Sequence, residues 1–184
     1  MDPLLSCAFS KQNELIAFLR ELVECESPSH DAAAVARCMD LFASRIEDIA
    51  KVKRVGAHLL CEFRIPKPRR KEGQILCLGH ADTVYDVGTL GSTMPFRMEG
   101  GRIRGPGVFD MKGGLAIVVF AARCLIELGV PVPRRVVLEV VSDEEIGSHT
   151  SRELTEKMAR ESHAVIVAEP AAGVDGKAKT ARKG

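Results

Sequence analysis

Hydrophobic residues recur along the chain with two different spacings. At three and four positions apart they line one face of a helix, over Asn13–Glu24, Ala32–Ile49, Leu115–Leu128 and about Ser151–Glu161. In short β-branched runs they predict strands, at Val52–Val55, His58–Arg64, Gln74–Gly79 and Ala164–Ala168, and in the run that begins at Val136. The pattern predicts an α/β domain, with the first two strands as an antiparallel hairpin at one sheet edge and His58 on a strand face there. A second, short hairpin is predicted over Phe96–Arg104, and Asp31 can cap the helix that begins at Ala32.

Side chains that bind cations follow the three central strands. Three consecutive acids end the Val136 run, and because carboxylates repel one another, a bound cation is one way to stabilise them. Ligands of open α/β sheets bind outside the carboxyl ends of the strands, so the three strand ends are predicted to share one site. Acids are also common in solvated turns, but that reading does not explain a potential ligand at all three ends. These residues are His80, Asp82, Asp143, Glu144, Glu145 and Glu169.

A glycine-rich segment, Gly105–Gly114, opens into one of the predicted helices. Such segments can hold phosphate, but this one matches neither the P-loop nor the dinucleotide-binding fingerprint. It carries Asp110 at its centre, and an aspartate at a helix start repels phosphate and attracts a cation. We therefore interpret Asp110 as a metal ligand, although a lone aspartate here would be read as a helix N-cap.

Composition narrows the function classes. The 184 residues carry a net charge of +1, with no tryptophan and one tyrosine, so we expect neither nucleic-acid nor membrane binding. The six cysteines are scattered without a Cys-x-x-Cys pair, which favours reduced, buried thiols and a cytoplasmic location. The first residues lack the basic start of a signal peptide, and no apolar run is long enough to span a bilayer.

The candidate set contains one histidine and many acids. A structural zinc site would be closed by cysteine and histidine, so this set does not predict one. Acids with one histidine suit two metal ions that share a carboxylate, about 3.5–4 Å apart, with an activated water between them. A further carboxylate beside that water can act as a general base.

The chain carries four motifs in the order Gly79–Val84, Gly105–Gly114, Ser142–Ser148 and Ala168–Pro170. In this order they closely resemble the di-zinc exopeptidase and amidohydrolase family that includes carboxypeptidase G, acetylornithine deacetylase and succinyl-diaminopimelate desuccinylase, peptidase family M20. One motif alone would be weak evidence, but four in family order are highly specific, and the resemblance covers nearly the whole chain. It implies a three-layer α/β/α fold with a mixed, mostly parallel, zinc-peptidase-like sheet.

The resemblance also implies roles for these residues. His80 and Glu169 would bind the first zinc and Glu145 the second, and Asp110 would bridge both, with a cis peptide bond often following it. Asp82 would orient the imidazole, and Glu144 would be the general base that takes a proton from the activated water. Zn²⁺ is the expected metal, two per site, with Co²⁺ or Mn²⁺ as alternatives. The implied reaction cleaves an amide bond next to a free carboxylate, in a small acyl-amino-acid or peptide substrate.

Family members are about twice as long, because a lid and dimerisation domain is inserted after the Glu-Pro motif. We therefore interpret 1–172 as the N-terminal part of an incomplete catalytic domain. Residues 173–184 would be a tail, disordered on its own, where that absent domain begins, and Lys179–Gly184 resembles its first strand. The family's last histidine ligand and its homodimer contacts would lie in absent regions. His149 and His163 are interpreted as bystanders, so neither would replace that ligand. Two hypotheses remain: a piece of a two-zinc glutamate carboxypeptidase-like enzyme or N-acyl amino acid deacylase, or a truncated, non-catalytic chain that binds one metal.

Overall fold

A five-stranded mixed sheet forms the centre of the molecule. The computed structural model describes residues 1–66, 71–173 and 176–180. Strand β2 is antiparallel to both β1 and β6, whereas β6, β3 and β7 are parallel to one another. All strands except β2 therefore run in one direction, which confirms the predicted mixed, mostly parallel sheet. The strands lie in the order β1 (Ala50–Val55), β2 (His58–Phe63), β6 (Arg135–Val141), β3 (Gln74–His80) and β7 (Ser162–Val167).

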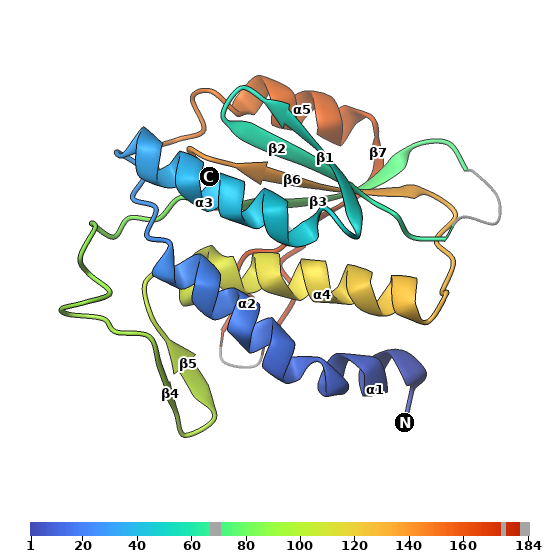
Figure 1. The fold of residues 1–184 in the computed structure, drawn as a ribbon. Coiled ribbons are helices and arrows are strands. Elements are labelled where there is room, and N and C mark those ends of the chain that lie inside the picture. Colours follow the sequence, from blue (N-terminus) through green and yellow to red (C-terminus); the bar gives the residue numbers. More distant parts are fainter. Residues whose placement is uncertain (67–70, 174–175, 181–184) are drawn as a thin grey trace.

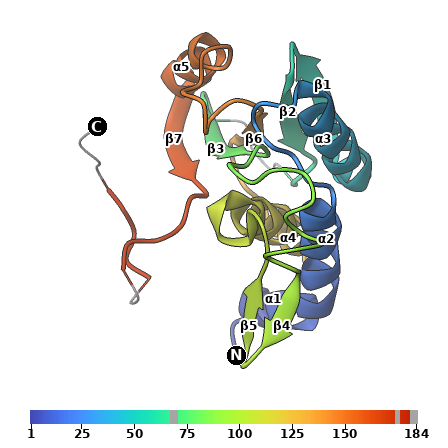
Figure 2. The same ribbon diagram turned by 90° about the vertical axis from the view of Figure 1, so that its left-hand side faces the viewer.

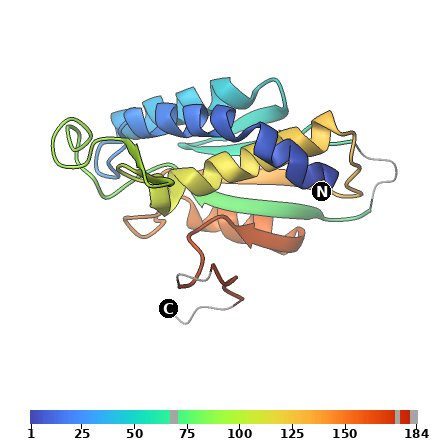
Figure 3. The same ribbon diagram turned by 90° about the horizontal axis from the view of Figure 1, so that it is seen from below.

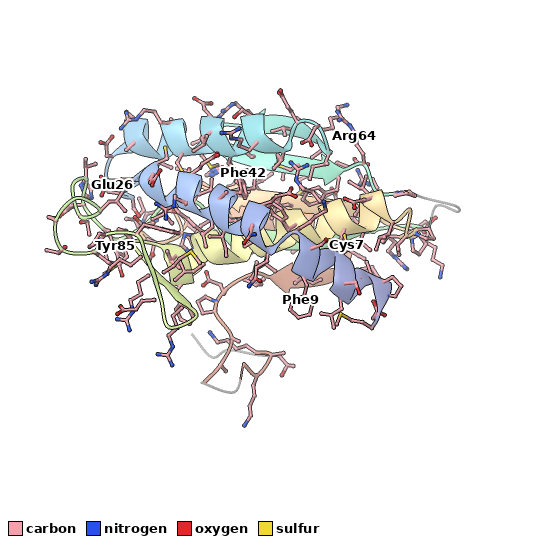
Figure 4. The ribbon with its side chains drawn as sticks, turned by 60° about the horizontal axis from the view of Figure 1, so that its bottom comes forward. Cys7, Phe9, Glu26, Phe42, Arg64 and Tyr85 are labelled. Carbon is pink, nitrogen blue, oxygen red and sulfur yellow. The ribbon has the colours of Figure 1, made fainter. Side chains whose placement is uncertain are left out.

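Helices cover both faces of this sheet (Figures 1 and 2). α2 (Gln12–Glu24), α3 (Ala32–Ile46) and α4 (Gly113–Glu127) share one continuous apolar core with one face, and the fully buried Phe42 lies in it (Figure 4). On the other face α5 (Arg152–Arg160) packs through Met158. Viewed from below, the strands lie between the two helical layers (Figure 3). The expected three-layer α/β/α fold is confirmed, because hydrophobic residues on both faces of a sheet need cover on both sides.

Most predicted elements are present, with ends that shift by one to three residues. The predicted helix from Ala32 ends at Ile46 rather than Ile49, because the chain turns there and enters β1 at Ala50. Asp31 caps its start as predicted, accepting hydrogen bonds from the next backbone N–H groups. Two short strands, β4 (Arg97–Glu99) and β5 (Arg102–Arg104), form the predicted hairpin.

The first helix, α1 (Pro3–Ser10), was not predicted. Its apolar residues show little amphipathic spacing, but its start is well marked. Pro3 occupies the first turn, and the carboxylate of Asp2 accepts hydrogen bonds from two backbone N–H groups there. The capping residues were thus a better indication of this helix than its hydrophobic pattern.

The end of the chain is only partly described. Residues 174–175 and 181–184, on which part of the predicted disordered tail and of the predicted lid strand falls, lie outside the described residues. Ala172 and Lys177 exchange backbone hydrogen bonds. Within the described part of the chain, no helix combines the length and apolar character needed to cross a bilayer. All six cysteines are free, and all but Cys25 are buried, in agreement with the predicted buried thiols.

One acid is buried under α5. Glu139 of β6 has no exposed surface, and its Oε1 accepts a hydrogen bond of 2.6 Å from the hydroxyl of Thr155. Its Oε2 is buried without a partner among the described residues. Burial raises the pKa of Glu139 because the charged form loses its hydration, and the Thr155 hydrogen bond only partly offsets this.

We expect Glu139→Gln to make stability less dependent on pH. The folded pKa of Glu139 is raised, so stability from the neutral carboxyl is present below the unfolded pKa and lost as pH rises through the folded pKa. Between those two pKa values wild type should lose about 1.4 kcal/mol per pH unit relative to the variant. Urea unfolding of both proteins from pH 4 to pH 8 measures this difference. An equal stability difference at every pH would contradict it.

Candidate metal site

Four segments meet at the carboxyl edge of the parallel strands. His80 is the last residue of β3, Glu169 lies two residues after β7, and the loop with Glu144 and Glu145 follows β6. Asp110 comes from the irregular turn η1 (Val108–Lys112), which leads into α4. Because parallel strands end at one edge of a sheet, residues far apart in the sequence converge here.

Three of the predicted ligands form one compact group. Nε2 of His80 lies 3.2 Å from Oδ1 of Asp110 and 3.3 Å from Oε1 of Glu169. One ligand atom from each of the three lies within 4.8 Å of the other two. Among the described residues this is the group whose geometry could hold a metal ion. The imidazole is buried, whereas the two carboxylates are partly exposed, so an ion could enter from solvent.

The neighbours of His80 determine which ring nitrogen faces this group. Nδ1 lies 2.9 Å from the backbone carbonyl oxygen of Asp82, and a carbonyl only accepts, so Nδ1 carries a hydrogen. Nε2 therefore faces the two acids with either a proton or a lone pair. A lone pair beside two carboxylates is repulsive unless a cation lies between them. The donor set thus fits a divalent metal bound by Nε2 and two carboxylate oxygens.

Asp82 connects His80 to the loop after β6. It has no exposed surface, and its carboxylate lies 3.5 Å from Nδ1 of His80. The same carboxylate accepts hydrogen bonds from Ser29 at 2.7 Å and from the backbone N–H groups of Glu144 and Glu145 at 3.2 Å each. Its role is therefore wider than the predicted orientation of the imidazole, since it also holds the backbone that carries the two glutamates.

Glu144 and Glu145 differ in their distance from the group. Oε2 of Glu144 lies 3.9 Å from Nε2 of His80, on a half-exposed side chain. Glu145 is partly buried and is not part of the three-residue group. Burial, together with repulsion from Asp110 and Glu144, raises the pKa of Glu145, although the nearby His80 lowers it. The structure thus brings His80, Asp110, Glu169 and Glu144 together and leaves Glu145 beside them.

Close backbone packing places Glu169 and Asp110. A Cβ atom on Gly114, at the start of α4, would overlap the carbonyl oxygen of Ala168, which precedes Glu169. Glycine therefore allows α4 to approach the end of β7. The Asp110–Met111 peptide bond is cis, as the family resemblance implied.

Lys112 anchors the same turn from the inside. Its side chain is 1% exposed, and Nζ donates hydrogen bonds to the carbonyl oxygens of Leu22 at 2.7 Å and Cys25 at 3.0 Å. Burial lowers the pKa of Lys112, because the charged ammonium loses its hydration. Nothing in the sequence marks Lys112, since a lysine at the start of a helix is usually solvated.

The segment after α2 supports the loop that follows Asp82. The carboxylate of Glu26 accepts hydrogen bonds of 2.8 Å from the backbone N–H groups of Gly88 and Leu90. Glu26 and Tyr85 lie at the same end of the molecule (Figure 4). These contacts link the turn after α2 to the loop that follows Asp82. Nothing in the sequence marks Glu26 or Ser29 in that turn as functional.

Electrostatics within the group are those of crowded acids around one imidazole. Burial and the negative charge of Asp110 raise the pKa of Glu169. Burial alone would lower the pKa of His80, but hydrogen bonds and charge from Asp82 outweigh it and raise the pKa to about 9. A bound dication would reverse the repulsion among the acids, which is why such clusters favour metal ions.

The other histidines and Asp143 lie elsewhere. His30 is exposed beside Asp86, and His163 is exposed at the start of β7, at the opposite end from Glu169. His149 is exposed, with its ring beside Gly147. Asp143 is buried and bonds to Thr150 rather than to His80. His58, expected only to lie on a strand face, is buried next to the loop after β6.

The chain is similar in sequence to a known family and to one of its members. Residues 76–181 match the model of peptidase family M20/M25/M40. Carboxypeptidase G2 of Pseudomonas sp. (strain RS-16) is 30% identical over 179 residues, which cover 95% of this chain and 43% of that protein.

Solved structures share the fold. Human carnosine dipeptidase 1 superposes with a TM-score of 0.78 at 20% identity, over 92% of this chain and 42% of that one. The M20 family metallo-carboxypeptidase Sso-CP2 from Sulfolobus solfataricus gives 0.71 at 20% identity, over 89% and 39%. The chain therefore spans less than half the length of each of these relatives.

Proposed function

We propose that this chain, which belongs to peptidase family M20/M25/M40, supplies the metal-binding and general-base residues of a hydrolase. The reaction proposed for that hydrolase is cleavage of an amide bond next to a free carboxylate. The family is one of metallopeptidases and related amidohydrolases, and the relatives it matches include a carboxypeptidase and a dipeptidase. An acyl-glutamate or another N-acyl amino acid is the proposed substrate class.

The observation that carries this proposal is the position of Nε2 of His80 between Asp110 and Glu169, at 3.2 and 3.3 Å. These three residues would hold a divalent metal, for which we propose Zn²⁺, with Co²⁺ or Mn²⁺ as substitutes. When bound, such an ion polarises a carbonyl and lowers the pKa of a water molecule. For a second ion we propose Glu145 as a ligand and Asp110 as the bridge.

Glu144 is the proposed general base. Its carboxylate reaches the edge of the group, 3.9 Å from Nε2 of His80, and its side chain is half exposed. It can therefore take a proton from an attacking water and pass it to the leaving amine. Asp82 accepts a hydrogen bond from the backbone N–H of Glu144 and thereby fixes the backbone that carries this side chain.

Metal loading and turnover together test the proposal. The purified chain is equilibrated with Zn²⁺ or Co²⁺, bound metal is counted, and release of glutamate from an N-acyl-glutamate is measured. Two ions per chain with turnover that chelation abolishes would support the proposed hydrolase. No bound metal would contradict it.

A second candidate is a non-catalytic chain that binds one metal. The observation that favours it is that His80, Asp110 and Glu169 form a single group among the described residues, with Glu145 outside it. One tightly bound ion without glutamate release would support this alternative and exclude hydrolysis by the chain alone.

A further inference from the structure

His58 lies at the site edge although it belongs to an antiparallel strand. It is the first residue of β2, and β2 runs opposite to β6, with Leu59 paired to Val140. The start of β2 therefore meets the carboxyl end of β6, where the loop with Glu144 and Glu145 begins. The side chain of His58 is only 3% exposed, so its ring nitrogens need partners inside the protein.

We propose that His58 is a positioning residue, which fixes the loop 142–150 so that Glu144 stands over the metal group. This inference rests on the proposed function, because it assigns His58 a part in the same reaction. The hydrogen bonds of His58 go to Ser142 and Thr150, at the two ends of the loop, and not to the three-residue group.

A series of hydrogen bonds runs from Ser142 through His58 and Thr150 to Asp143, and the donor and acceptor of each bond can be assigned. The backbone N–H of Ser142 can only donate, so Nδ1 of His58 accepts from it, at 3.3 Å. In the neutral ring Nε2 then carries the hydrogen and donates to Oγ1 of Thr150 at 3.2 Å. That hydroxyl in turn donates to Oδ2 of Asp143 at 2.8 Å, and the backbone N–H of Thr150 donates to the same oxygen at 2.6 Å.

Other hydrogen bonds act on the same loop. Internal hydrogen bonds close it, from Ser148 N–H to the carbonyl of Asp143 at 2.7 Å and from Gly147 N–H to that of Glu144 at 2.9 Å. Ser148 has a φ of 55°, a backbone conformation that residues other than glycine rarely adopt without support. Asp82 accepts hydrogen bonds from the backbone N–H groups of Glu144 and Glu145 within the loop. His58 bonds to the two ends of the loop.

Loss of this support should affect catalysis more than binding of the first metal ion, whereas a second ion would be affected as well, because Glu145 lies on the same loop. The ligand atoms of His80, Asp110 and Glu169 come from other segments, so the group would keep its geometry. Glu144 rides on the loop, and a displacement of about 1 Å of a catalytic group can cost about 10²-fold in rate. Residues that support ligands from behind typically cost about 10–100-fold when removed.

Three variants test the positioning role. His58→Leu removes the hydrogen bonds to Ser142 and Thr150, and Thr150→Val removes the hydroxyl that links His58 to Asp143. His58→Asn keeps an acceptor at the place of Nδ1. We expect His58→Leu to lower kcat about 10–100-fold with little change in KM, and to speed hydrogen exchange of the amides 144–148. Thr150→Val should change both quantities in the same direction, and His58→Asn should recover part of each.

Thr155→Val is the matched control. It also removes a hydroxyl hydrogen bond next to β6, but that bond goes to Glu139 under α5 and not to the loop. It should lower stability while leaving kcat and loop exchange unchanged. Equal losses of kcat in Thr155→Val and His58→Leu, or unchanged loop exchange in His58→Leu, would overturn the proposal. The exchange experiment needs no substrate, so it decides whether His58 holds the loop even if the chain hydrolyses no amide.

Discussion

Replacement of Glu144 by glutamine should lower kcat for amide hydrolysis by about 10²–10⁴-fold, the usual contribution of a general base. Glutamine has nearly the same shape as glutamate but cannot accept a proton at neutral pH. The side chain is half exposed, and the backbone N–H of residue 144 would still donate to Asp82, so the fold and the loop should be unaffected. Single-turnover release of glutamate from an N-acyl-glutamate, with metal in excess, measures this change.

The control for that variant is Glu153→Gln, the same substitution on the exposed face of α5. It should retain wild-type kcat. Metal affinity should be nearly equal in all three proteins, because Glu144 is not one of the three residues whose atoms converge. If Glu144→Gln lost metal together with activity, the residue would be a ligand and the proposed base would have to be another acid.

The sequence was most informative where strands end in the same direction. The β-branched runs located β3, β6 and β7, and the rule that ligands bind at carboxyl strand ends placed their terminal residues at one edge. His80 and Glu169 follow from that rule with no knowledge of loop structure. Asp110 needed the glycine pattern as well, because it lies in an irregular turn with φ −121° and ψ 100°.

What the sequence did not reveal depends on antiparallel pairing and on side-chain direction. The rule for parallel strands says nothing about the start of an antiparallel strand, so His58 was read as part of a strand face. The predicted antiparallel hairpin left open which of its strands borders β6, and only the observed pairing of β2 with β6 places the start of β2 near the site. The role of Glu145 as a metal ligand was implied by the family resemblance and stays a prediction. Side chains of adjacent loop residues point in different directions, and the contact between Asp82 and the backbone N–H of Glu145 could not be read from the sequence.

His80→Ala should weaken divalent-metal binding by about 10²–10³-fold. Zinc sites with four protein ligands bind with about 10–16 kcal/mol, or about 2.5–4 kcal/mol for each ligand. The buried imidazole supplies the nitrogen donor of the group, and Asp110 and Glu169 cannot replace it. Competition between the protein and a chromophoric chelator for Zn²⁺ measures the affinity. His163→Ala, the same substitution at an exposed position of β7, should bind metal as wild type does.

The pH dependence of binding identifies His80 more sharply than the loss alone. In the metal-free protein the contacts with Asp82 raise the pKa of His80 to about 9, so below that pH a proton occupies Nε2 and must leave before a metal can bind. The affinity of wild type should therefore rise about tenfold per unit from pH 7 to about pH 9 and level off above it. His80→Ala has no such proton to displace, so its weak binding should change little over the same range. Parallel pH profiles for the two proteins would mean that another group competes with the metal and that Nε2 of His80 is not its ligand.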